Sequence, residues 1–335
     1  MKVAVVGAGS WGTAVAAIAC ANADAVLWAR RAELADQIDV THENPSYLPD
    51  IALPPELHAT ASLEEACSGA DIVVLGVPSH GLRTVLCDAQ PFISPKAAVV
   101  SLAKGIEQGT LHRMTEVIGE VLDGHDPGSV GVLTGPNLAK EVAAGQPTAS
   151  VVAVPDAAVA EQLQQVFFTP TLRVYTNPDV VGCEMAGALK NVLAIGAGIA
   201  DGLGYGDNTK AALMTRGLAE LARLGVACGG DPLTFAGLAG MGDLIATCSS
   251  PQSRNRHVGF QLGQGRSLDD IVSEMNMVAE GVKSTAAVIE IAQRANVEMP
   301  LAAFVGRVLY EGAQPADLVP ELMLRKAKSE LHGIR

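Results

Sequence analysis

One lysine within a long apolar segment is the residue of this sequence that most clearly could do chemistry. Between Met185 and Ala200 the only charged side chain is Lys190, and Asn191 beside it is the only other strongly polar one. A lysine at the wall of a cleft has a lowered pKa and can donate or accept a proton. The alternative is a core helix whose lysine reaches out to water, with the small residues serving only close packing. The segment is too short to cross a bilayer, so the rest of the chain must decide.

A glycine-rich turn at the start of the chain predicts a dinucleotide site. The β-branched run Lys2–Gly7 leads into G-A-G-S-W-G, with Gly7, Gly9 and Gly12, and then into an alanine-rich helix over Thr13–Ala23. A strand before the glycines and a helix after them is the context that gives this motif its meaning. Gly7 allows the tight turn, Gly9 lets the backbone approach a pyrophosphate, and Gly12 lets helix and strand pack closely. The helix N-terminus then faces the phosphates.

The end of the second expected strand indicates which cofactor is bound. After Ala25–Trp28 the sequence has Ala29, Arg30 and Arg31, where an NAD-specific fold carries Asp or Glu for the ribose 2′-hydroxyl. A guanidinium at this place matches a 2′-phosphate and leaves no carboxylate to repel it. NADP(H) is therefore favoured, and NAD(H) stays open because the two arginines could simply be solvated.

Further polar residues follow other expected strands. Lys104 comes after Ala97–Leu102, and T-G-P-N-L-A-K-E (Thr134–Glu141) comes after Val130–Leu133. Ligands of open α/β sheets bind at the carboxyl ends of the strands, so Lys104 is a candidate substrate contact. A Gly-Pro-Asn junction before a helix leaves backbone N–H groups free for an anion or an amide.

The second half of the chain contains two further polar groups. Asp243 is flanked by glycines within G-L-A-G-M-G-D-L-I-A-T-C, and S-R-N-R follows at Ser253–Arg256. Ser253, Arg254 and Asn255 at a helix N-terminus form a candidate phosphate site. Taken singly, Asp243 could be only a cap or turn residue, and the arginines could be solvated at a helix start.

The elements that must position these residues change in type after Pro178. Before it, strands alternate with helices, which predicts a doubly wound, mostly parallel Rossmann-like sheet. After it, only helical patterns follow, so we expect a dinucleotide-binding domain over 1–180 and an all-helical catalytic domain over 181–335, with Lys190 at their seam. The expected strands are Lys2–Gly7, Ala25–Trp28, Ala70–Val77, Ala97–Leu102, Val130–Leu133, Val151–Val154 and Leu172–Thr176. The helices expected in the first domain are Thr13–Ala23, Leu63–Ser68, one beginning near Ser79, Gly109–Val121 and Ala157–Phe168, with loop over Asp36–His58. Those of the second are Val180–Ala200, Thr209–Leu224, Leu233–Phe235, Leu268–Met275, Thr285–Ala295, Leu301–Tyr310 and Pro315–Met323.

Composition restricts the partners. The chain has 335 residues, 23 Lys and Arg against 36 Asp and Glu, and a formal net charge of −13. Such a charge repels nucleic acid and anionic membranes, so neither is an expected partner. Six scattered cysteines without a C-x-x-C pair or a His/Cys cluster fit reduced thiols in the cytoplasm and predict no metal site.

Taken together, these motifs resemble NAD(P)-dependent sn-glycerol-3-phosphate dehydrogenase of the bacterial soluble type. The resemblance covers nearly the whole chain, and G-A-L-K-N with the downstream S-R-N-R is its most specific part. It also rests on G-A-G-S-W-G-T-A, S-L-A-K-G-I-E, T-G-P-N-L-A-K-E, D-G-L-G-Y-G-D-N-T-K-A-A, G-D-L-I-A-T-C and V-A-E-G-V. It implies hydride transfer between NAD(P)H and a small-molecule substrate, dihydroxyacetone phosphate, giving the glycerol phosphate that starts phospholipid synthesis.

The resemblance also implies roles for particular residues. Lys190 is the implied catalytic proton donor and acceptor. The implied substrate contacts are Lys104, Gly135, Asn137, Lys190, Asn191, Asp243, Thr247, Ser253, Arg254 and Asn255. The implied cofactor contacts are Gly7, Gly9, Ser10, Trp11, Gly12, Arg30, Arg31, Lys104, Ala139, Arg254, Val278 and Glu280. Many members have Ser where this chain has Asn137, so the contact there is in doubt. The resemblance leaves the oligomeric state open, a homodimer included.

The chemistry agrees with these roles. Reduction of a ketone builds negative charge on its oxygen, which a nearby ammonium stabilises before donating its proton. We expect Lys104 to lie near Lys190, because like-charge repulsion would lower the pKa of one of them.

Two other classes of protein remain. A related 3-hydroxy acid dehydrogenase would also carry a lysine on the seam helix, but it would bind a carboxylate and would not need S-R-N-R. A non-catalytic NADP(H) sensor would keep the glycine loop and Arg30 but have no use for Lys190.

Overall fold

The computed structural model describes residues 1–275 and 279–327, which form two compact units. The first contains residues 1–103 and 112–180, and the second contains residues 104–111, 181–275 and 279–327. The sequence interpretation assigned 104–111 to the first domain. The contacts of residues 104–111 instead place this segment with the helices, so Lys104 belongs to the same unit as Lys190.

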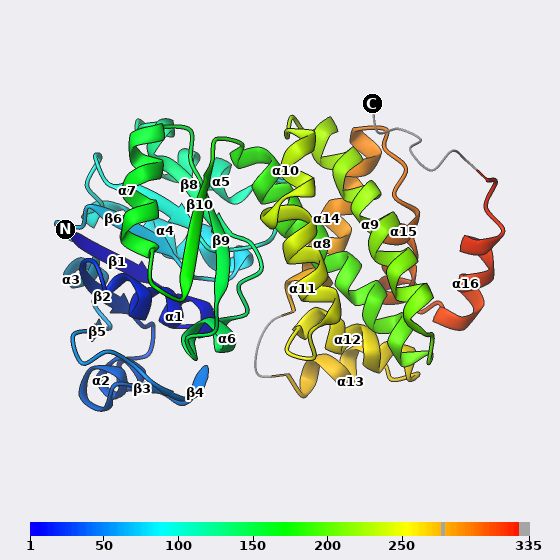
Figure 1. Ribbon diagram of the computed structural model, residues 1–335, viewed down its shortest axis with the longest axis horizontal. Helices are drawn as coiled ribbons and strands as arrows, with labels where there is room; N and C mark the ends of the chain where they lie inside the picture. The colour runs from blue at the N-terminus through cyan, green and yellow to red at the C-terminus, as the bar shows by residue number, and fades with distance from the viewer. Residues whose placement is uncertain (276–278, 328–335) are drawn as a thin grey trace. The chain divides into compact units, whose positions relative to one another are not determined.

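An eight-stranded sheet forms the centre of the first unit (Figure 1). Its strand order is β10-β9-β8-β7-β6-β1-β2-β5, and all neighbours are parallel except β8 and β9. Six neighbouring strands, in the order β5-β2-β1-β6-β7-β8, have the spatial order of a dinucleotide-binding sheet. This confirms the predicted mostly parallel, doubly wound fold. The strand bounds are β1 Lys2–Val6, β2 Asp24–Trp28, β5 His58–Thr60, β6 Ile72–Leu75, β7 Ala98–Ser101, β8 Val130–Thr134, β9 Thr148–Ala153 and β10 Leu172–Asn177.

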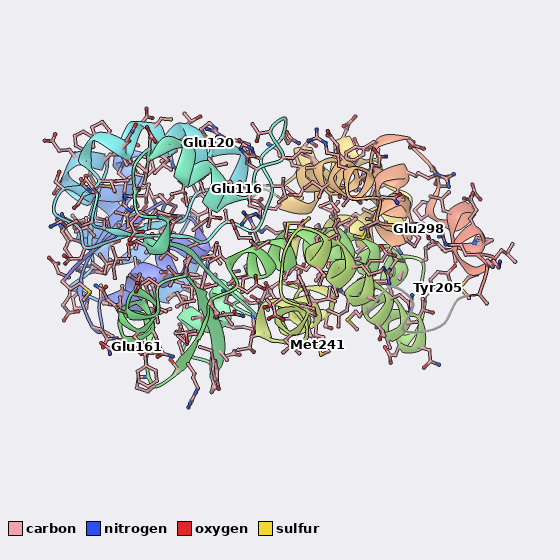
Figure 2. All side chains as sticks on the ribbon, turned by 90° about the horizontal axis from the view of Figure 1, so that it is seen from above. Glu116, Glu120, Glu161, Tyr205, Met241 and Glu298 are labelled. Atoms are coloured by element: carbon pink, nitrogen blue, oxygen red, sulfur yellow. The ribbon has the colours of Figure 1, made fainter. Side chains whose placement is uncertain are left out.

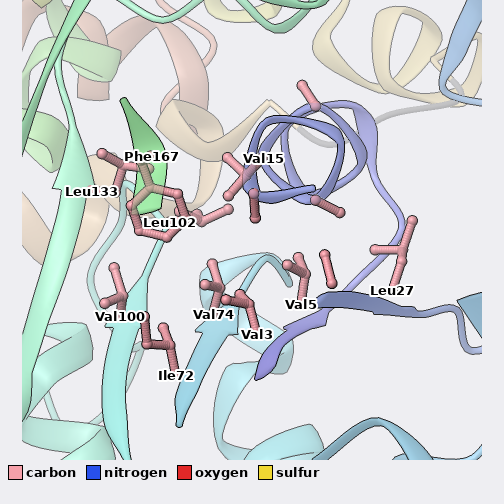
Figure 3. Packing of buried hydrophobic residues seen from close by; sticks show 14 of the residues in the cluster. Val3, Val5, Val15, Leu27, Ile72, Val74, Val100, Leu102, Leu133 and Phe167 are labelled. Carbon is pink, nitrogen blue, oxygen red and sulfur yellow. The ribbon is translucent and has the colours of Figure 1, made fainter. Parts of the chain in front are cut away.

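Both faces of this sheet are buried, and the strand residues alternate between them. Val3 and Val5 of β1 pack with Val15 of helix α1 on one side (Figure 3). Ala4 and Val6, which point the other way, belong to a second apolar cluster. Burial on both faces explains why the strands are continuous apolar runs. The helices of the first unit are α1 Ser10–Ala19, α2 Ala32–Thr41, α3 Leu63–Cys67, α4 Ser79–Ala89, α5 Met114–Val121, α6 Ala139–Ala143 and α7 Ala157–Phe167.

From residue 181 on, the elements described in the second unit are helices, and α8 runs through its interior (Figure 1). By length and composition α8 is the one helix of the described chain that could cross a membrane, but 94% of its most apolar window is buried within the structure. That burial is typical of a core helix. The bounds are α8 Val180–Gly202, α9 Asp207–Ala227, α10 Pro232–Ala236, a π-helix Leu238–Gly242, α11 Asp243–Ser249, α12 Arg254–Gly263, α13 Leu268–Ser273, α14 Glu280–Arg294, α15 Pro300–Tyr310 and α16 Pro315–Met323.

Two predictions of secondary structure are wrong. The segment Asp36–His58, expected as loop, contains most of α2 and the two-stranded sheet of β3 (Glu43–Asn44) and β4 (Leu48–Ala52). Pro45 follows β3, Pro49 lies within the short strand β4, and Pro54 and Pro55 lie between β4 and β5, where a missing N–H is tolerated. The helix expected over Gly109–Val121 begins only at Met114. Gly109 and Leu111 both have positive φ, which a right-handed helix does not allow.

Candidate active site

A buried carboxylate holds two lysines together in the helical unit. Lys190 Nζ lies 3.1 Å from Asp243 Oδ1 and donates a hydrogen bond of 2.7 Å to Thr247 Oγ1. Lys104 Nζ lies 2.8 Å from Asp243 Oδ2. Lys190 is 4% exposed and Asp243 is 2% exposed. The ammonium of Lys190 is therefore ion-paired in the interior. This rules out the alternative of a core helix whose lysine reaches out to water.

The charge on this cluster is unbalanced. Two ammonium groups share one carboxylate, so a local positive charge remains in a chain whose net charge is −13. Burial lowers the pKa of Lys104 to about 8, Asp243 opposes this change, and Lys190 adds to it. This agrees with the expectation that the two lysines lie near each other and that one pKa is lowered, although burial is the larger cause.

Helix α11 presents Asp243 and Thr247 on one face, because residues four apart lie one turn above each other. Thr247 Oγ1 donates to Asp243 Oδ1 at 3.2 Å and accepts from Lys190. The π-helix over Leu238–Gly242 directly precedes α11, and such turns are frequent at functional sites. Asp243 caps the π-helix and is also the partner of both lysines, so it is more than a cap or turn residue.

A chain of amide hydrogen bonds continues from Lys104 across three elements. Asn191 Nδ2 donates to the carbonyl oxygen of Lys104 at 2.8 Å, and Asn255 Nδ2 donates to Asn191 Oδ1 at 2.9 Å. Asn255 Oδ1 accepts from the backbone N–H of Gly281, at the start of α14, also at 2.9 Å. Both asparagines are buried. The network fixes the Lys104 backbone and the beginnings of α12 and α14 relative to Lys190.

The S-R-N-R segment combines capping with exposed charge. Ser253 caps α12, its side chain accepting a hydrogen bond from the backbone N–H of Arg256. Arg256 pairs with Asp201, a contact that sequence reasoning missed. Arg254 lies in the first turn of α12, where desolvation lowers the pKa of its guanidinium and the nearby Glu280 opposes this change. The helix N-terminus and Arg254 together offer a cationic surface for a phosphate.

The small residues of α8 have a packing role as well. A Cβ on Gly198 would lie 2.0 Å from the Arg256 carbonyl oxygen, and a Cβ on Gly259 would lie 2.0 Å from the Ile195 carbonyl oxygen. Helices α8 and α12 therefore touch backbone to backbone. Close packing and a functional lysine, which the sequence presented as alternatives, occur together in α8.

The glycine-rich turn of the first unit has the conformation that phosphate binding requires. Gly7 has φ +127°, and a Cβ on Gly12 would lie 1.9 Å from the Gly7 carbonyl oxygen. At Gly9 a Cβ would meet nothing within 4 Å, so this edge of the loop is open. Ser10 donates to the Tyr47 carbonyl oxygen, and the indole nitrogen of Trp11 is buried without a hydrogen-bond partner. The loop fits the pyrophosphate of a dinucleotide.

The other predicted residues of the first unit lie at strand ends. Arg30 is exposed after β2, while Arg31 lies over the Tyr47 ring at 5.9 Å and 3.4 Å from Ser46 Oγ. Gly135 directly follows β8 with φ +118°. Asn137 is buried and Ala139 begins α6.

The remaining predictions concern Val278, metal ions and the cysteines. Val278 lies outside the described residues. Within residues 1–275 and 279–327 no group of three or more His, Cys, Asp or Glu side chains could hold a metal ion. The six cysteines are all unbridged.

A glycine-rich turn in a doubly wound sheet and a buried lysine–carboxylate cluster define an NAD(P)-dependent oxidoreductase. The family models described as the N-terminus and C-terminus of NAD-dependent glycerol-3-phosphate dehydrogenase match residues 2–160 and 179–320. The chain belongs to this glycerol-3-phosphate dehydrogenase family.

Curated relatives and a solved structure match over almost the full length. The chain is 53% identical over 332 residues to a glycerol-3-phosphate dehydrogenase using NAD(P)+ from Sphingopyxis alaskensis, with 99% of each chain covered. It is 52% identical to such an enzyme from Streptomyces coelicolor, with 98% of each covered. The crystal structure of glycerol-3-phosphate dehydrogenase from Coxiella burnetii is 38% identical with a TM-score of 0.91, covering 97% of this chain and 99% of that one.

Proposed function

We propose that this chain reduces dihydroxyacetone phosphate to sn-glycerol 3-phosphate and catalyses the reverse oxidation, with Lys190 as the proton donor and acceptor. The cluster of Lys190, Asp243 and Lys104 carries this proposal. An ammonium has three N–H donors, and Lys190 directs two of them to Asp243 and Thr247. The third is left for the substrate oxygen. We further propose that the enzyme acts in the cytoplasm and supplies phospholipid synthesis.

The proton and the hydride go to neighbouring atoms. When bound, NAD(P)H supplies the hydride, which forms the new C–H bond at the carbonyl carbon. Lys190 gives its proton to the carbonyl oxygen as negative charge develops there, so that C=O becomes CH–OH. In the reverse direction the neutral amine takes the hydroxyl proton. Asp243 and Thr247 keep Nζ in place, and the second cation, Lys104, stabilises the anionic oxygen further.

The phosphate of the substrate has its own proposed site at the start of α12. Arg254 supplies the charge, Ser253 caps the helix N-terminus, and Asn255 connects it to the start of α14. We propose Asn191 and Thr247 as further substrate contacts, together with Gly135 and Asn137 from the strand β8 junction. For the cofactor we propose the glycine-rich turn from Gly7 to Gly12, with Arg30, Arg31, Lys104, Ala139, Arg254, Val278 and Glu280.

A substrate comparison tests the phosphate site. NADPH oxidation should be rapid with dihydroxyacetone phosphate, slow with unphosphorylated dihydroxyacetone, and absent with a panel of keto acids. Arg254→Ala should raise the KM for dihydroxyacetone phosphate about 10- to 100-fold, as expected for a lost charge-assisted contact of about 1.5–3 kcal/mol. Arg266→Ala, which removes a partly exposed arginine paired with Glu274, should leave the KM for both compounds unchanged. Equal losses for both dihydroxyacetone compounds would show that Arg254 does not bind the substrate phosphate.

We propose that Arg30 favours NADP(H). This arginine is exposed at the end of β2, where dinucleotide-binding folds bind a 2′-phosphate. Arg30→Asp should raise the KM for NADPH far more than the KM for NADH, with a difference of about 1.5–3 kcal/mol. Steady-state kinetics with both cofactors measures this. An unchanged NADPH/NADH ratio would mean that another residue reads the 2′-phosphate.

A further inference from the structure

The helical unit contains a cavity that the reaction does not use. Its volume is about 870 Å³, within the range of small-molecule sites. Helices α8, α9, α15 and α16 form its walls, and Tyr205 and Glu298, two of its lining residues, are labelled in Figure 2. Lys104, Lys190, Asp243 and Arg254 are not among the residues that line it.

The walls of this cavity are apolar along several helices. Leu193 of α8, Leu213 of α9, Phe304 of α15 and Leu322 of α16 are examples of the aliphatic and aromatic side chains that line it. Part of the motif D-G-L-G-Y-G-D-N-T-K-A-A, which has no role in the proposed reaction, also faces it through Thr209 and Ala212. A surface of this kind favours a hydrocarbon chain over a hydrated ligand.

Cations outnumber anions around the cavity. Arg216, Arg223, Arg325 and Lys326 line it together with two carboxylates, Glu220 and Glu298. Glu298 pairs with Arg325 at 3.1 Å. Both oxygens of Glu220 accept hydrogen bonds from the backbone N–H of Leu301 at the start of α15, and burial raises the pKa of Glu220 to about 7. Arg223 also lies near Glu220 and Glu298, so the lining as a whole has four cations and two carboxylates, in a chain with a net charge of −13.

We propose that this cavity binds an amphipathic anion, an aliphatic chain that ends in a carboxylate or a phosphate. The apolar walls take the chain, and Arg216 and Arg223, which are close enough to interact electrostatically, take the anionic end.

The test uses purified full-length protein and three ten-carbon probes, decanoate, decyl phosphate and neutral decyl maltoside, each below its micelle concentration. Calorimetric titration should show one site per chain for one or both anions and at least tenfold weaker binding of the neutral probe. The two anions show whether carboxylate or phosphate is preferred. Ala212→Trp, which fills the cavity from an exposed position on α9, should weaken anion binding at least tenfold. If that variant does not fold, Thr209→Phe serves the same purpose.

Charge variants distinguish specific binding in the cavity from nonspecific attraction of anions to the protein surface. Arg216→Gln should weaken anion binding at least threefold, whereas Arg294→Gln, which removes an exposed cation that does not line the cavity, should leave binding unchanged. Absence of stoichiometric binding, or binding that Ala212→Trp and Arg216→Gln both leave unchanged, overturns the proposal. Sedimentation showing a dimer that Ala212→Trp converts to monomer also overturns it, because the face would then be an interface between copies.

Discussion

Lys104 has a different part in the site from Lys190, although both contact the same carboxylate. Lys190 is almost fully buried, whereas the Lys104 side chain is 16% exposed and its backbone carbonyl is held by Asn191. Its ammonium has the lowered pKa, about 8. The positive charge that an anionic substrate meets at this position therefore varies with pH in the range where the enzyme can be assayed.

The activity should depend on pH through the charge of Lys104. Below about pH 8 Lys104 is charged and, as a proposed substrate contact, would attract the anionic substrate; above that pH the charge is lost. The value of kcat/KM for dihydroxyacetone phosphate should therefore fall as pH rises from 8 to 9.5, since this ratio reports the free enzyme. Lys104→Arg, which stays charged throughout, should remove the fall. A pH profile that is the same in both proteins would exclude Lys104 from substrate attraction.

At the level of helices, the position of the active-site residues depends on the contact between α8 and α12. Lys190 lies on α8 and Arg254 begins α12, and the two helices touch where Gly198 and Gly259 have no side chain. A methyl group at this contact would push apart the two helices that carry the proposed proton donor and the proposed phosphate ligand.

Gly259→Ala should destabilise the protein by about 1–3 kcal/mol, the range for overpacking, and should also lower kcat. Denaturant unfolding and steady-state kinetics measure the two effects. The matched control is Gly119→Ala in α5, where a Cβ meets nothing within 4 Å. That change should stabilise the protein by about 0.5–1 kcal/mol through helix propensity. If both substitutions have the same effect, the contact between α8 and α12 does not set the geometry.

The sequence predicted the helices and strands with strong periodicity, and it missed elements whose identity depends on distant partners. Strand β4 (Leu48–Ala52) contains a proline and an aspartate, and only its pairing with β3 makes it a strand. Asp243 looked like a turn residue because of its glycine neighbours, and no local pattern shows that a π-helix would precede it. Lys104 follows a strand of the sheet, yet its contacts are with the helical unit. The candidate catalytic and binding residues could be identified from the sequence, but their hydrogen-bond partners could not.

For the whole molecule, the proposed pyrophosphate site and the proposed proton donor belong to different units. The glycine-rich turn belongs to the sheet, and the cluster of Lys190, Asp243 and Lys104 belongs to the helices. Loss of Lys190 should therefore spare the cofactor. It should also spare the fold, because Asp243 keeps Lys104 as its partner and is not left as an unpaired buried charge.

The most direct test of the account is the Lys190→Met variant, which keeps most of the side-chain volume and removes the ammonium. We expect it to fold, to bind NADPH with the affinity of the parent in a fluorescence titration, and to reduce dihydroxyacetone phosphate at least about 10²-fold more slowly, as expected for loss of a positioned general acid. Lys96→Met, which removes an exposed lysine of the first unit, should behave like the parent. A folded Lys190→Met enzyme that binds NADPH and turns over near the parent rate would contradict the assignment, and Lys104 would become the candidate proton donor.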